Sequence, residues 1–335
     1  MTGAKMNTDV IKSGTKKSNV AIDITKIIMA VLVIAIHTEP FGFSFILDKG
    51  FGLLTRFCVP FFFVTSSYFF FINKNNNPFK YIKRLFILYF IWSIIYLPFD
   101  IPNLKTLSFI QILVKYFWSG NGHALWYLCG SIIGFIIVFV LSKLMKPKTI
   151  LIVSVLFLIV GCLKSTYAPA IERIFPVTIS DFLGSRNGLF YAFPYYAVGM
   201  YLAENDERYS KVSIINVVGV VVSFVLLCIE SVVMVMYFKT DHTILWLSVL
   251  PLTYNFFIIV KNTKVPLPGK NFVFIRKFST LVYVSHCLYQ YFFEGVLRLK
   301  YWESFLAVLV TVMLVSSLVI FLSDKRPFRW LKVFY

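Results

Sequence analysis

The chain has 335 residues, of which 59% are apolar and 19% are aromatic, and its formal net charge is +18. A soluble domain averages about 45–50% apolar residues, so this composition excludes an ordinary soluble protein. The basic residues form short clusters between apolar stretches, which argues against a nucleic-acid partner and is typical of a protein embedded in a lipid bilayer.

Continuous apolar stretches predict about ten membrane-spanning helices, because backbone exposed to lipid must form its hydrogen bonds within its own segment. A β-barrel would instead show alternating segments of about ten residues. Residues 104–118 have helical periodicity and are expected to form an interfacial helix rather than a span. The fold class is therefore an all-α, polytopic transmembrane helix bundle. Its predicted spans are residues 22–39, 51–72, 81–98, 124–145, 149–164, 187–204, 212–237, 243–260, 273–297 and 301–323.

The distribution of basic residues predicts which ends of the helices face the cytoplasm. With the N-terminus placed inside, 22 Lys and Arg residues fall in inside segments and 10 in outside segments. This bias predicts a multi-pass protein of the cell membrane with both termini in the cytoplasm. Residues 1–21 are the expected cytoplasmic arm, 22–323 the transmembrane domain and 324–335 a short basic cytoplasmic tail. The oligomeric state is not predicted.

The first span, "KIIMAVLVIAIHTEPFGF" over residues 26–43, carries Lys26 near its inner end and His37 past its midplane. Ionisable side chains within a span usually face protein or a watery cavity. Imidazole titrates near neutrality, so His37 is a candidate general base, with an interfacial histidine bonded to a carbonyl as the alternative. Lys26 is either a cation for a ligand or a lysine that extends to the interface. Glu39 could orient His37, and Pro40 predicts a turn there.

A second histidine lies in the ninth predicted span, in "KFSTLVYVSHCLYQYFF". Ser279, Tyr283 and His286 share one face of that helix, because they are spaced at i, i+4 and i+7. Such a polar face lines either a substrate path or a helix–helix interface.

Three further motifs carry candidate binding residues. "NGHALWYLCG" contributes His123 and Trp126, although Trp126 also suits an interfacial aromatic belt. "SRNGLFYAFPYYAVG" contributes Arg186 and Asn187, and "RFCVPFFFVTSSYFFF" begins at Arg56. The five cysteines are scattered without disulfide or metal-type spacing, so no metal is expected and they are interpreted as small buried apolar residues.

Taken together, these motifs resemble the acyltransferase family 3 membrane proteins of bacteria over residues 22 to about 333. Lys26 and His37 keep the spacing of the family's first-span pattern, although that pattern usually begins with arginine. A lysine there acts as a point charge and not as a bidentate group. "RFCVPFFFVTSSYFF", "HALWYL", "RNGLFYAFPYYAVGMYLA" and "STLVYVSHCLYQ" resemble the family's later motifs, in the same order.

The resemblance implies transfer of an acyl group, commonly acetyl, from acyl-coenzyme A in the cytoplasm to a hydroxyl of an envelope carbohydrate. A cationic inner mouth that includes Arg84 suits the donor phosphates. On this interpretation the catalytic residues are His37 and Glu39, and the donor-binding residues are Lys26, Arg84, Ser279, Tyr283 and His286. The expected acceptor-binding residues are Arg56, His123, Trp126, Arg186 and Asn187.

The chain also resembles the membrane half of vancomycin-resistance serine racemases, through "IAIHTEPFGF" and "TRFCVPFFF". In that group the same fold precedes a soluble pyridoxal-phosphate domain, to which none of these residues corresponds, so racemisation is not expected here. The alternative function is therefore a non-catalytic membrane module for the uptake or sensing of an amino acid. Inverted repeats or paired broken helices would favour a transporter, and none is evident.

Overall fold

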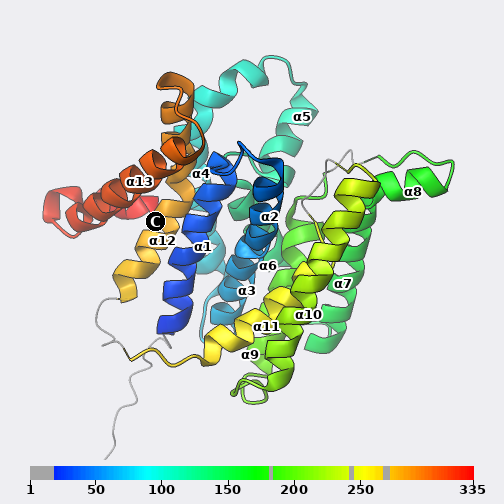
Figure 1. The fold of residues 1–335 in the computed structure, drawn as a ribbon. Helices are drawn as coiled ribbons and strands as arrows, with labels where there is room; N and C mark the ends of the chain where they lie inside the picture. The colour runs from blue at the N-terminus through cyan, green and yellow to red at the C-terminus, as the bar shows by residue number, and fades with distance from the viewer. Residues whose placement is uncertain (1–18, 181–183, 241–244, 267–271) are drawn as a thin grey trace, which may run out of the picture.

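The computed structural model describes residues 19–180, 184–240, 245–266 and 272–335, and in these ranges the regular structure is entirely helical. Most of the predicted cytoplasmic arm, residues 1–18, lies outside the described residues. The all-α bundle predicted from the sequence is confirmed (Figure 1).

Each of the ten predicted spans coincides with a helix. Six helical segments in the described ranges are long and apolar enough to cross a membrane by themselves, and α6 is a shorter apolar helix. Three other predicted spans, 187–204, 243–260 and 273–297, coincide with helices that are not among these six segments. The count of ten spans therefore remains a prediction. The first nine elements are α1 (Val20–Thr38), α2 (Phe45–Thr55), α3 (Cys58–Phe71), α4 (Pro78–Leu104), α5 (Phe109–Leu113), the π-helical turn η1 (Val114–Ser119), α6 (Trp126–Leu141), α7 (Pro147–Lys164) and α8 (Ala168–Ile174).

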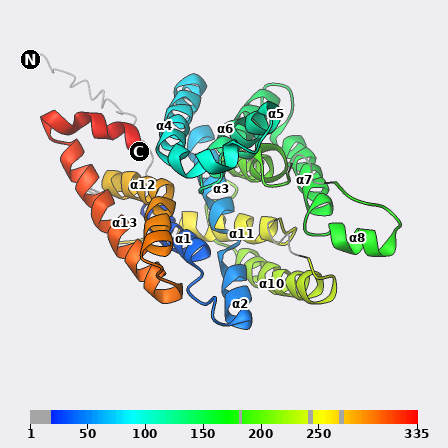
Figure 2. The ribbon, with the colours of Figure 1, turned by 90° about the horizontal axis from the view of Figure 1, so that it is seen from above.

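The second half of the chain continues the bundle. α12 packs between α1 and α13, and α10 packs against α11. Figure 2 shows α13 as a long element along one edge, with α12 and α1 beside it. The remaining elements are η2 (Gly188–Ala192), α9 (Phe193–Glu204), α10 (Ile214–Ser231), η3 (Val232–Tyr237), α11 (Val249–Asn262), α12 (Phe272–Gln290), η4 (Tyr291–Val296), α13 (Tyr301–Ser323) and a final 3-10 helix η5 (Arg326–Phe334).

The second predicted span is divided into two helices, and it begins six residues earlier than predicted. α2 ends at Thr55 and α3 begins at Cys58. Pro60 explains the break, because proline has no N–H and its ring clashes with the carbonyl four residues earlier, here that of Arg56. The motif that begins at Arg56 therefore opens on a helix junction rather than on a continuous span.

On α13 the buried face includes several serines and the exposed face is apolar, which is the reverse of a helix in a soluble bundle. The buried residues of α13 recur about every fourth position and include Ser304, Ser316 and Ser323. Its outer face carries Leu306, Leu314 and other exposed apolar side chains. Lipid solvates such a face, while small residues let helices approach closely. The protein is therefore a membrane protein.

α3 and α9 approach each other closely in the centre of the bundle. A Cβ atom added at Gly199 would lie 2.4 Å from the carbonyl oxygen of Val64 and 2.6 Å from Cβ of Ser67. The Ser67 hydroxyl donates to the carbonyl of Tyr196 at 2.6 Å across the same interface. This pair of helices forms a rigid wall beside the candidate site.

The connections that contain α5 and α8 lie at the same end of the bundle (Figure 1). We call this the outer end. The beginnings of α1 and α12 and the end of α11 lie at the opposite, inner end. The segment predicted to form an interfacial helix, residues 104–118, contains the end of α4, the short helix α5 and most of the turn η1, and its position at the membrane interface stays a prediction.

Candidate functional site

The end of α1 presents His37 to the interior of the outer half of the bundle. α1 ends at Thr38, and Glu39 then adopts a left-handed conformation with φ 45°, which confirms the predicted turn before Pro40. Glu39 is exposed and His37 is half-buried. Because Glu39 leaves the helix axis, its carboxylate is directed by the turn rather than by the helix face that carries His37.

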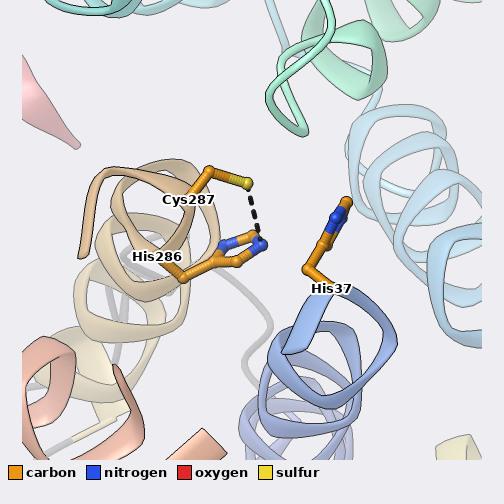
Figure 3. A group of neighbouring side chains, drawn as sticks. All are labelled: His37, His286 and Cys287. Carbon is orange, nitrogen blue, oxygen red and sulfur yellow. Dashed lines mark hydrogen bonds between the residues drawn. The ribbon is translucent and has the colours of Figure 1, made fainter. Parts of the chain in front are cut away.

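His286 of α12 faces His37 from the neighbouring helix, with the two ring centroids 5.1 Å apart. Nδ1 of His286 lies 2.7 Å from the Tyr283 carbonyl, which can only accept, so this nitrogen carries the proton. Nε2 of His286 therefore offers a lone pair, and it lies 3.4 Å from Sγ of Cys287 (Figure 3). The site thus holds two imidazoles and a thiol at one point between two helices.

An outer cavity of about 360 Å³ reaches His37 from the outer end of the bundle. Its lining residues are His37, Thr38, Glu39, Glu294, Arg298, Leu299, Lys300 and Tyr301. The amide of Gln290 donates to the carbonyl of His37 at 2.6 Å and to the carboxylate of Glu294 at 2.9 Å. Ser304 donates to the other carboxylate oxygen at 2.7 Å. This network fixes Glu294 relative to the end of α1.

A second wall of the site combines aromatic rings with arginine. The guanidinium of Arg186 lies 5.2 Å from the ring of Trp126, which stacks on Tyr191 at 5.4 Å. Arg186, His286 and His123 are close enough to His37 for their charges to act on its imidazole. Arg56 and Arg186 both act on the phenol of Tyr191. The structure therefore brings Arg56, Trp126 and Arg186 to the same region as the two histidines.

His123 belongs to a separate polar network at the outer end. Its Nε2 lies 3.1 Å from Oδ1 of Asp100, and its Nδ1 is hydrogen-bonded to the hydroxyl of Tyr291. Lys115 donates to the same Asp100 oxygen at 2.8 Å, and the His123 ring stacks on Tyr96. Both ring nitrogens of His123 are thus occupied by side chains of the protein.

The inner end of the bundle holds a cluster of charged residues, which we call the inner cluster: Asp23, Lys26, Arg84 and Arg276. Asp23 is buried and lies 3.9 Å from Nε of Arg276. The charges of Asp23, Arg276 and Arg84 act on Lys26, whose Nζ lies 5.6 Å from the ring of Phe69. α1, α4 and α12 therefore bring three cations and one anion together, below His37 on the same helix.

Three further predicted binding residues have polar atoms engaged within the protein. The Asn187 side chain accepts from the N–H groups of Leu189 and Phe190, at 2.9 Å each, and so caps η2. The Ser279 hydroxyl donates to the carbonyl of Arg276, and Tyr283 donates to that of Ala124. The side-chain oxygen of Asn187 and the hydroxyl protons of Ser279 and Tyr283 are therefore used within the protein in this arrangement.

The site and its surroundings also contain five residues that were not predicted from the sequence: Asp23, Asp100, Cys287, Gln290 and Glu294. Four of them have ionisable or amide side chains in or beside apolar segments, and this is the signal that could have identified Asp23, Asp100, Gln290 and Glu294. Cys287 gave no such signal, because a thiol in an apolar helix has the same appearance as any buried cysteine.

A family model described as "Acyltransferase domain" matches residues 19–322. The chain belongs to the acyltransferase 3 family. The family resemblance stated from the sequence motifs is therefore confirmed, and with it a membrane acyltransferase type of protein. No solved structure matches the chain at the level of significance at which its curated relatives do.

The curated relatives are named for a different activity. Two amino-acid racemases of Enterococcus faecalis are 30% identical over 216 residues, covering 58% of this chain, and 25% identical over 288 residues, covering 80% of it. A serine/alanine racemase of Enterococcus gallinarum is 27% identical over 221 residues, 57% of this chain. The chain spans 30–40% of the length of these relatives.

Proposed function

We propose that the protein transfers an acyl group, in the first instance acetyl, from acyl-coenzyme A on the cytoplasmic side of the bacterial plasma membrane to a hydroxyl of an envelope carbohydrate on the other side. The observation that carries this proposal is the position of His37. It faces His286 at 5.1 Å, lines the outer cavity and lies on the helix that begins at the inner cluster.

The inner cluster supports the donor side of the proposal. Lys26, Arg84 and Arg276 supply three cations against the single carboxylate of Asp23, so the cluster has a net positive charge. A nucleotide thioester carries phosphates that such a cluster attracts. Its thin pantetheine arm would extend along α1 toward His37.

The chemistry that we assign to His37 is general-base catalysis. Its imidazole takes the proton of the acceptor hydroxyl while the oxygen attacks the thioester carbonyl, and the thiol of coenzyme A leaves. Glu294, fixed by Gln290 and Ser304 beside the same cavity, accepts hydrogen bonds from other acceptor hydroxyls. Arg186, near both histidines, stabilises the oxyanion that develops at the carbonyl.

The test is acetyl transfer by purified protein in proteoliposomes loaded with acetyl-coenzyme A. Hydrolysis of acetyl-coenzyme A, or exchange of its acetyl group, gives a signal before the acceptor is identified. We expect activity in the wild type and its loss in His37→Gln. Wild-type protein that binds no acetyl-coenzyme A and releases no free coenzyme A would overturn the proposal.

A second candidate is a module for amino-acid uptake or sensing. The names of the racemase relatives favour it, and so does the outer cavity, whose lining combines Glu39 and Glu294 with Arg298 and Lys300. Two acidic and two basic side chains suit a small zwitterion. Uptake of labelled serine by the same proteoliposomes without acetyl-coenzyme A would favour this candidate over acyl transfer.

A further inference from the structure

His37, His286 and Cys287 bring two imidazole rings and a thiol together, which are three side chains able to bind a metal ion. One ligand-type atom from each of the three, a ring nitrogen or the sulfur, lies within 4.8 Å of the other two. Neutral imidazole and thiolate are the ligands that zinc prefers. We propose that this group is a binding site for a zinc-type divalent cation at the junction of α1 and α12 (Figure 3).

The distances within the group fit tetrahedral coordination. Zinc lies about 2.0–2.1 Å from a histidine nitrogen and about 2.3 Å from a cysteine sulfur, so neighbouring ligands of a tetrahedral ion are about 3.5 Å apart. Nε2 of His286 and Sγ of Cys287 are 3.4 Å apart. Two ligands therefore have the required spacing already, and His37 points from α1 toward the same space (Figure 3). His37 is the third member of the set, because its ligand atom lies within 4.8 Å of the other two.

The hydrogen bond of His286 prepares it for this role. Its Nδ1–H donates to the Tyr283 carbonyl at 2.7 Å, which fixes the ring and leaves the Nε2 lone pair directed at Cys287. A ligating histidine typically makes such a bond with its second nitrogen, because the bond sets the tautomer and raises the basicity of the ligating atom. Tyr283, predicted as a donor-binding residue, then acts through its carbonyl as a positioning residue.

The ligand atoms of this group favour zinc over harder cations, and the outer cavity gives a cation access to the group. Magnesium and calcium need several oxygen ligands, and this group offers two nitrogens and one sulfur. His286 and Cys287 are buried, whereas half-buried His37 also lines the outer cavity. The cavity gives a path to the site, and a water molecule in it would complete the four-coordinate shell.

Binding has a definite proton balance and a consequence for the proposed transfer. The thiol of Cys287 gives up its proton to solvent and binds as thiolate, and both histidines bind in their neutral forms. The cation then holds the lone pair of His37, so the loaded protein lacks the base of the proposed reaction. Zinc is therefore expected to inhibit transfer, and a chelator to restore it. The binding itself does not depend on the proposed function.

The experiment is a titration of chelator-treated, purified protein in detergent with cobalt(II). Tetrahedral cobalt bound by thiolate gives charge-transfer absorption in the near ultraviolet together with visible d–d bands. We expect saturation at one equivalent per chain and displacement by zinc. Zinc should also raise the melting temperature of the wild type. Cys287→Ser should remove the charge-transfer band, and His37→Gln should weaken binding at least about tenfold, since even outer-shell changes cost 10–100-fold.

The matched control is Cys228→Ser, because Cys228 is a free, half-buried cysteine of α10 outside the group. It should leave the titration unchanged. No saturable cobalt band in the wild type, or a band that persists in Cys287→Ser, would overturn the site. Thermal unfolding of each variant shows whether it has folded. Acetyl transfer by wild type that binds no cobalt contradicts this inference alone. Stoichiometric cobalt binding by protein that shows no transferase activity in its chelator-treated, metal-free form contradicts the proposed function alone.

Discussion

The inner cluster and the outer half of the site lie on the same helix, α1, but their side chains are held in different ways. Within the inner cluster, the carboxylate of Asp23 lies 3.9 Å from Nε of Arg276 and is the one acidic group among three cations. At the outer end Gln290, Glu294 and Ser304 are joined by hydrogen bonds of 2.6–2.9 Å. The inner cluster therefore carries a net positive charge that suits an anionic ligand, whereas the outer end has fixed geometry, as a reacting group requires.

The largest effect should come from His37→Gln, which keeps a hydrogen-bonding group of similar size but removes the base. Transfer should fall about a hundredfold to ten-thousandfold, the usual contribution of general-base catalysis. The affinity for acetyl-coenzyme A should remain, because the inner cluster is untouched. Initial rates and equilibrium binding on the same preparation measure both quantities. Near wild-type transfer by a folded His37→Gln protein would show that this histidine is structural.

The next effect should come from neutralising the inner cluster with Lys26→Gln and Arg84→Gln together. Each charge near the surface contributes up to about 1 kcal/mol, so KM for acetyl-coenzyme A should rise about tenfold. The transfer rate at saturating acetyl-coenzyme A should remain close to that of wild type. This is the reverse of His37→Gln, which should lower the rate and leave donor affinity unchanged. Lys80→Gln, a change at an exposed lysine in the first turn of α4, the helix that carries Arg84, is the control. An unchanged KM in the double variant would contradict the role of the inner cluster.

A smaller effect is expected for Gln290→Met, which keeps the length of the side chain and removes its two donated hydrogen bonds. Each such bond is worth about 1 kcal/mol, so part of the geometry around His37 and Glu294 should be lost. We expect the transfer rate to fall about fivefold with donor KM unchanged. Gln111→Met provides the control, because Gln111 caps α5 away from the cavity. An equal loss in both variants would indicate a general effect of the substitution.

The smallest effect is expected for Asp23→Asn. The Asp23 carboxylate offsets part of the cationic charge of Lys26 and Arg276, so its neutralisation should tighten donor binding. The expected change is a two- to threefold fall in KM, within the range of about 0.2–1 kcal/mol for a partly screened pair. Glu204→Gln changes another inner-end carboxylate, which pairs with Lys74 instead. A rise in KM for Asp23→Asn would mean that Asp23 positions the cations rather than competing with the donor.

The sequence predicted the parts of this arrangement that depend on one helix at a time. Apolar stretches located the helices, and an ionisable residue inside a span identified His37 and His286. The break at Arg56 depends on Pro60 and could have been predicted from the same motif. The engagement of Asn187 as a cap also follows a local rule, since asparagine is a favoured helix-capping residue.

The contacts between helices could not be predicted in this way. The carbonyl of His37 and the amide of Gln290 meet although 253 residues separate them. The approach of Cys287 to the histidine pair depends on how α12 rotates against α1, and periodicity alone does not fix that rotation. The same holds for His123, whose partners Asp100 and Tyr291 come from different helices. The sequence pattern identifies the polar side chains that are costly to bury. The packing of the helices determines which groups form hydrogen bonds with them.

The length of α13 connects the outer cavity to the thickness of the surrounding bilayer. A helix of 23 residues rises about 35 Å, more than the roughly 30 Å of the hydrocarbon core, so α13 is long enough to cross the core at a tilt. A thinner membrane increases that tilt at a cost of fractions of a kcal/mol per ångström of mismatch. Ser304, which holds Glu294 beside His37, lies in the first turn of α13. Lipid chain length is therefore a physical variable that acts on the geometry of the cavity without altering any residue in it.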